Sequence, residues 1–135
     1  MAALANADGW RLDLEATGEK SLSRSLTLFG VVYFGTFSPE TIADSLCVPD
    51  PGTARLYAIN LFDASEQRDF DNDGSLERFW VIGSLIPDTP SPHFGSDGEI
   101  RLLLPPGSGG DGGNPMPIGE SLTNPYGSCW YREDY

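Results

Sequence analysis

The chain is poor in basic residues. It contains 8 Lys and Arg against 20 Asp and Glu, which gives a formal net charge of −12 at pH 7. DNA, RNA and anionic membrane surfaces are bound mainly through Lys and Arg, so we expect no nucleic-acid partner. No apolar run reaches the roughly 18 residues that a membrane-spanning helix needs, and we therefore expect no membrane insertion.

Cysteine and histidine are also scarce. Cys47 and Cys129 lie far apart, unlike the ligands of a zinc site. They would form one disulfide outside the cell or remain two buried thiols in a reducing compartment, and we favour the disulfide. His93 stands alone beside prolines, and the sequence has no Ser/His/Asp set and no phosphate-binding glycine loop. We therefore expect the protein not to be an enzyme.

Glycine and proline, in contrast, are abundant. The 16 Gly and 11 Pro among 135 residues disfavour helices and favour short strands joined by turns. We predict an all-β chain with a single domain over residues 8–135 and a flexible Gly/Pro-rich loop at 105–119. Residues 1–7 have no basic region typical of a signal peptide; we interpret them as a disordered leader or artificial extension, and the chain as a fragment of a longer secreted protein.

Alternating, β-branched and aromatic residues predict the strands. The predicted strands cover residues 10–14, 22–28, 31–37, 55–62, 79–83, 92–94, 99–104 and 129–135. Glycine turns at Phe29-Gly30 and at Ser96-Asp97-Gly98 would join neighbouring strands into antiparallel hairpins.

The segment from Asp69 to Glu77, here called the acidic loop, carries the strongest functional signal. Oxygen-bearing side chains occupy alternate positions at Asp69, Asp71 and Asp73, and Glu77 ends the segment. Calcium takes six to eight oxygen ligands, and these four carboxylates with the Ser75 carbonyl would supply most of them. The sequence therefore predicts a Ca²⁺ site between two strands.

The acidic loop differs from an EF-hand, which has Glu at loop position twelve; here that position is Trp80. A solvated Asp/Asn/Gly turn without metal is the alternative interpretation. We favour the metal site because spacing, charge density and Gly74 all agree with it.

Several segments together resemble the C-terminal region of the PilY/PilC family of type IV pilus biogenesis factors and tip-associated adhesins. The similarity is carried, in order, by Gly9–Leu14, Ser25–Thr36, Arg55–Asn60, His93–Gly98 and Tyr126–Glu133. Ser25–Thr36 and Arg55–Asn60 are similar to a quinoprotein-type blade repeat. The resemblance implies a quinoprotein-like β-propeller domain, of which this chain would form antiparallel meanders equal to about one and a half to two blades, with long loops.

The resemblance also implies a function. The chain would be a calcium-binding, non-enzymatic module of a secreted or cell-surface pilus protein, and metal loading would be linked to pilus extension and metal loss to retraction. Expected partners are minor pilins or pilus tip proteins, and a host-surface ligand. One alternative is a metal-free scaffold that binds minor pilins by strand addition, for which Trp130, Tyr131 and Tyr135 are candidate contact residues. A quinoprotein dehydrogenase fragment is a further alternative.

Overall fold

The computed structural model describes residues 9–39, 52–96 and 98–104, and the backbone of residues 116–121. Over these ranges the chain forms strands and no helix, which confirms the all-β prediction. The strands are β1 (Lys20–Ser21), β2 (Leu26–Leu28), β3 (Val31–Ser38), β4 (Thr53–Asn60), β5 (Phe79–Gly83), β6 (Ser91–Phe94), β7 (Glu99–Leu103) and β8 (Met116–Ser121). The described residues accordingly include no helix of the length and apolarity needed to cross a bilayer.

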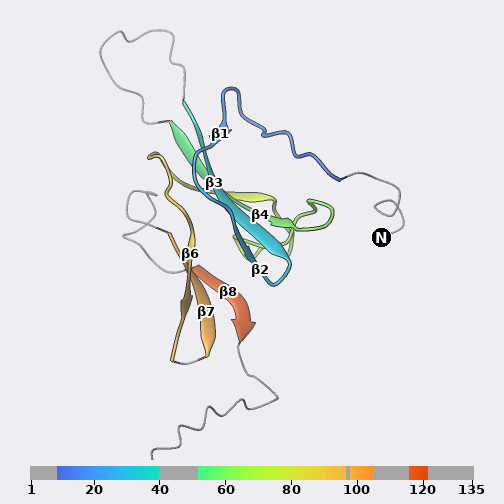
Figure 1. Cartoon of the computed structure of the whole chain (residues 1–135), viewed down its shortest axis with the longest axis vertical. Coiled ribbons are helices and arrows are strands. Elements are labelled where there is room, and N and C mark those ends of the chain that lie inside the picture. Colours follow the sequence, from blue (N-terminus) through green and yellow to red (C-terminus); the bar gives the residue numbers. More distant parts are fainter. Residues whose placement is uncertain (1–8, 40–51, 97, 105–115, 122–135) are drawn as a thin grey trace, which may run out of the picture.

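The larger sheet has the order β1-β3-β4-β5, and β2 pairs with the same edge of β3 as β1. All of its pairings are antiparallel. The long β3 and β4 pair without interruption from Val31–Asn60 at one end to Ser38–Thr53 at the other. They form the centre of the sheet in Figure 1.

The smaller sheet is a second antiparallel meander with the order β6-β7-β8. A tight turn joins β6 to β7, as predicted, and the Gly95 amide donates a hydrogen bond of 2.8 Å to the Glu99 carbonyl. Neither sheet closes on itself. The two meanders lie one beyond the other in Figure 1, and this open arrangement resembles part of a β-propeller.

The larger sheet buries apolar side chains on both faces, because successive residues of a strand point to opposite sides. On one face, Leu56 of β4 and Tyr33 of β3 pack with Ile100 and Leu102 of the smaller sheet. On the other, Tyr57 stacks on Phe34 with ring centroids 5.0 Å apart. The second face is partly covered by Leu12 and Leu14.

The first edge of the larger sheet is interrupted, which corrects the strand predicted over 22–28. The Ser23 hydroxyl accepts a hydrogen bond of 3.0 Å from the Gly35 amide, and so occupies a position that a backbone carbonyl would take in a continuous ladder. A Cβ at Gly35 would lie 2.8 Å from Cγ of Pro87. The close approach of Pro87 therefore requires glycine at this position.

Three other strand predictions need correction. Residues 10–14 form no strand; their alternation reflects the partial burial of Leu12 and Leu14 rather than pairing. β4 ends at Asn60 instead of Phe62, because the Asn60 side chain accepts the Phe62 amide at 2.8 Å and starts a turn. β8 begins at Met116 and pairs with β7, so the Gly/Pro-rich segment contributes a strand where a loop was predicted.

Candidate metal site

The acidic loop lies in the connection between β4 and β5, as predicted. Its two ends are held together at the neck, where Arg68 and Glu77 form an antiparallel bridge. The Glu77 amide donates a hydrogen bond of 2.6 Å to the Arg68 carbonyl. Because the neck is closed, residues 69–77 must curl back on themselves.

Two side chains anchor this neck to the core. The Arg68 guanidinium donates hydrogen bonds of 3.2 and 3.0 Å to the hydroxyl of Tyr33, which is buried in the first core cluster. Phe70 turns inward, packs against the same cluster and stacks on Trp80 with centroids 6.1 Å apart. The base of the acidic loop is therefore fixed by packing, whereas its tip is exposed.

Within the acidic loop, carboxylates accept hydrogen bonds from the backbone amides that follow them. Asp69 accepts the amides of Asp73 and Gly74 at 3.2 and 3.0 Å. Asp71 accepts the Asp73 amide at 3.1 Å, and Asp73 accepts the Ser75 amide at 2.7 Å. These contacts turn each aspartate toward the inside of the curl.

The curl also requires left-handed backbone at two positions. Asn72 has φ of 60° and Gly74 has φ of 92°, and Asn and Gly are the residues that adopt this region most readily. At the far end, the Glu77 carboxylate accepts the Phe70 amide at 2.8 Å. That contact brings the last carboxylate back toward the start of the acidic loop.

The result is a cluster of four carboxylates. Asp69, Asp71, Asp73 and Glu77 each offer one oxygen, and these four oxygens all lie within 4.8 Å of one another. Calcium–oxygen distances of about 2.3–2.6 Å place opposite ligands roughly 4.6–5.2 Å apart. The cluster therefore has the dimensions of a metal site, and the four residues could hold a metal ion.

The two arginines that flank the acidic loop do not neutralise it. Arg68 is directed at Tyr33, and the Arg78 guanidinium pairs with Glu66 at 3.0 Å. Among the described residues, no ion pair includes any of the four clustered carboxylates. Their mutual repulsion is opposed by amide contacts alone, a situation in which a bound cation is stabilising.

The remaining predicted site residues are not members of the four-carboxylate cluster. The Ser75 amide lies in the curl, but a metal-ligand role for its carbonyl stays a prediction. His93, for which no site role was predicted, is exposed in β6, opposite Arg101 of the smaller sheet. The disulfide candidates and the weak partner contacts lie outside the described residues: Cys47, Cys129, Trp130, Tyr131 and Tyr135.

Sequence reasoning missed a buried ion pair beneath the second face of the sheet. Glu19, whose side chain is 0% exposed, pairs with Arg55 at 3.1 Å. Burial alone would raise the pKa of Glu19, but hydrogen bonds from the Thr36 hydroxyl and the Ala16 amide, together with the charge of Arg55, lower it below the ordinary value. No local sequence motif predicts this pair, because Glu19 and Arg55 lie in distant segments and meet only in the folded chain.

Glu19 also affects a neighbouring tyrosine. Burial, followed by the negative charge of Glu19, raises the pKa of Tyr57 to about 12. Tyr57 therefore stays protonated at neutral pH.

Comparison of the chain with protein-family models, with curated proteins and with solved structures gives no match.

Proposed function

We propose that the chain is a calcium-binding module without catalytic activity. The observation that carries this proposal is the convergence of four carboxylates within 4.8 Å without a basic partner. An all-oxygen ligand set suits a hard cation, whereas zinc and copper favour His and Cys. Calcium suits it better than magnesium, because calcium accepts irregular geometry and more ligands.

Bound calcium would stabilise one particular junction. The acidic loop lies in the connection from β4 to β5, and its neck is tied to the core through Arg68 and Phe70. An ion held by residues from both ends of the acidic loop would fix that connection and the surface around it. Loss of the ion would release the exposed tip while the anchored base remained.

The proposed setting is the surface of a bacterial type IV pilus. This part rests on the resemblance of the sequence to the PilY/PilC family. In that setting the module would contact minor pilins or tip proteins, and calcium occupancy would contribute to the control of extension, retraction and adhesion. Co-purification with minor pilins in calcium and in chelator would test it, with calcium-dependent recovery as the supporting result.

Isothermal titration calorimetry tests the metal proposal. Calcium is expected to bind the wild-type chain at one site, and magnesium to bind more weakly because it demands near-ideal octahedral geometry. Asp69→Ala is expected to abolish the calcium signal, since Asp69 carries two of the amide contacts that shape the curl and one clustered oxygen.

Asp13→Ala is the matched control. Asp13 is an exposed carboxylate outside the cluster. It pairs with Arg11, and the side chains of Asp13 and Arg11 are 78% and 84% exposed. The Asp13→Ala variant should bind calcium with the same affinity as the wild type. Equal calcium binding by Asp69→Ala and the wild type would contradict the assignment.

A further inference from the structure

A surface pocket of about 480 Å³ lies beside the acidic loop. It is lined by Glu15, Glu66, Leu76, Glu77, Arg78, Phe79, Trp80 and Val81. Most of the lining is the start of β5 and the residues just before it. We call this hollow the β5 pocket.

The β5 pocket combines exposed apolar walls with an excess of negative charge. Leu76, Trp80 and Val81 are 58%, 39% and 52% exposed. Three carboxylates line it against a single basic residue, Arg78. Apolar side chains left this open beside carboxylates are typical of an interaction surface.

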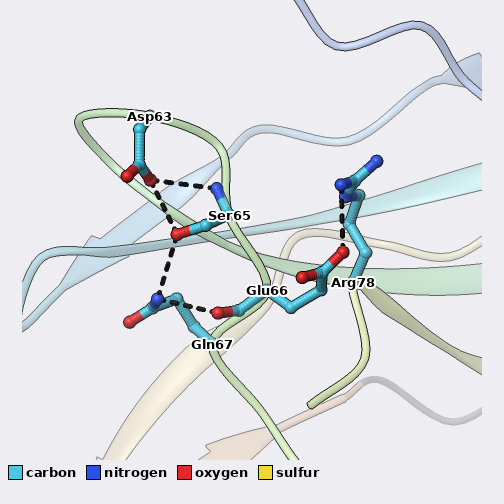
Figure 2. Close-up of polar contacts among 5 residues, drawn as sticks. All are labelled: Asp63, Ser65, Glu66, Gln67 and Arg78. Atoms are coloured by element: carbon cyan, nitrogen blue, oxygen red, sulfur yellow. Dashed lines mark hydrogen bonds and ion pairs between the residues drawn. The ribbon is translucent and has the colours of Figure 1, made fainter. Parts of the chain in front are cut away.

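The one basic residue in the β5 pocket is already engaged. Figure 2 shows the Glu66 side chain directed at Arg78, and the two pair at 3.0 Å. Figure 2 also shows how the segment before Glu66 is held, because Asp63 accepts the Ser65 amide and hydroxyl at 3.0 and 2.7 Å. The pair cancels one negative charge. Because Glu77 is a proposed calcium ligand, Glu15 is the carboxylate that remains to attract a cation, within a chain of net charge −12.

Among the described strands, none pairs with the edge of β5 that faces away from β4. β5 is the last strand of the larger sheet. Its residues, Phe79–Gly83, include no charged side chain and no proline, which are the usual protections of a free edge. A bulge at Ile82 leaves Phe79–Val81 as the regular stretch.

The alternation of side chains along β5 determines which side chains lie on the same face as the carboxylates of the β5 pocket. Phe79 packs in the second core cluster with Leu14 and Ala64, so it lies on the face that Glu15 and Glu66 border. A strand added beside β5 would direct every second side chain to that face. The aliphatic parts of its Lys or Arg side chains would cover the apolar side chains of the β5 pocket, and their charged groups would reach the carboxylates.

We propose that the β5 pocket and the free edge of β5 bind an extended basic segment of a partner protein by strand addition. The recognised segment alternates basic and apolar residues over about one strand length. This interaction goes beyond calcium binding. Glu77 belongs to both the pocket and the carboxylate cluster, so Glu15 carries the pocket charge that bound calcium would leave unchanged.

A capped peptide of alternating Lys and Val, titrated into the full chain and followed by amide NMR shifts, tests the proposal. We expect saturable shifts at residues 79–81, weakened by added salt. The same peptide with Glu in place of Lys should not bind. Equal binding of the two peptides, no binding of either, or shifts confined to other residues would overturn the proposal.

Two matched pairs of variants sharpen the test. Val81→Lys puts a positive charge on the edge of β5 and should weaken binding of the basic peptide at least about tenfold. Leu85→Lys, at a position that is 55% exposed and outside the pocket, should leave the affinity unchanged. Glu15→Gln should weaken binding of the basic peptide about two- to fivefold, and Asp88→Asn should leave the affinity unchanged. All four positions are exposed, so folding should persist. An unchanged affinity in both Val81→Lys and Glu15→Gln would refute the site.

Discussion

Asp71→Ala is expected to remove the calcium-dependent rise in melting temperature. A ligand present at 100 times its Kd stabilises the folded state by about 2.7 kcal/mol, which corresponds to roughly 10 °C for a domain of this size. Asp71 lies at the exposed tip of the acidic loop and contributes one of the four clustered oxygens. Its replacement should therefore leave the melting temperature in chelator almost unchanged while eliminating the gain in calcium.

Thermal melts of the wild type and Asp71→Ala, each in calcium and in chelator, measure this difference. Asp88→Ala serves as the control, because Asp88 is an exposed carboxylate outside the cluster, and it should keep the full calcium response. A wild-type melting temperature that is the same in calcium and in chelator would refute the metal site. So would an equal gain in Asp71→Ala.

The second large effect is expected at the buried ion pair. Arg55→Met should lower the free energy of unfolding by about 3 kcal/mol, because it leaves the fully buried Glu19 carboxylate without its charged partner. The loss should be much larger than that caused by removal of an exposed ion pair, for which the usual value is about 0–1 kcal/mol. Arg11→Met, which breaks the exposed pair with Asp13, is the matched control.

A double-mutant cycle separates the ion pair from simple packing. Glu19→Gln removes the charge while keeping an amide that can accept the Thr36 hydroxyl bond. The double variant Glu19→Gln/Arg55→Met should therefore be more stable than the sum of the two single losses implies. Additive losses in urea denaturation would show that the charges do not interact.

The same pair predicts a pH dependence. The pKa of Glu19 is below its ordinary value of 4.5 in the folded protein, so the folded state binds fewer protons than the unfolded state around that pH. The stabilisation is complete above about pH 4.5 and is lost as the pH falls through the lower, folded-state pKa. The stability difference between the wild type and Arg55→Met should therefore narrow in acid.

The sequence was sufficient to predict the acidic loop and most of the strands because both depend on local signals. The spacing of Asp69, Asp71 and Asp73, with Gly74 after them, already defines a curl in which carboxylates accept nearby amides. Long runs of β-branched and aromatic residues likewise predicted β3 and β5. These features need no information about distant parts of the chain.

What the sequence could not predict depends on contacts between distant segments. The Glu19–Arg55 pair forms only when the turn before β1 is placed against β4. The interruption of the first edge follows from the Ser23 hydroxyl bonding to Gly35, where Pro87 also approaches. Alternation at residues 10–14 predicted the partial burial of Leu12 and Leu14 correctly and pairing wrongly, since period-two burial needs no hydrogen-bonded neighbour.

The most direct test of the central claim is a crystal structure of the chain grown in calcium. We expect one strong anomalous peak inside the acidic loop, with oxygens of Asp69, Asp71, Asp73 and Glu77 at about 2.3–2.6 Å from it. The opposite result would be well-ordered carboxylates that keep their amide contacts around water alone. That outcome would contradict a calcium site and leave the segment as a solvated acidic turn.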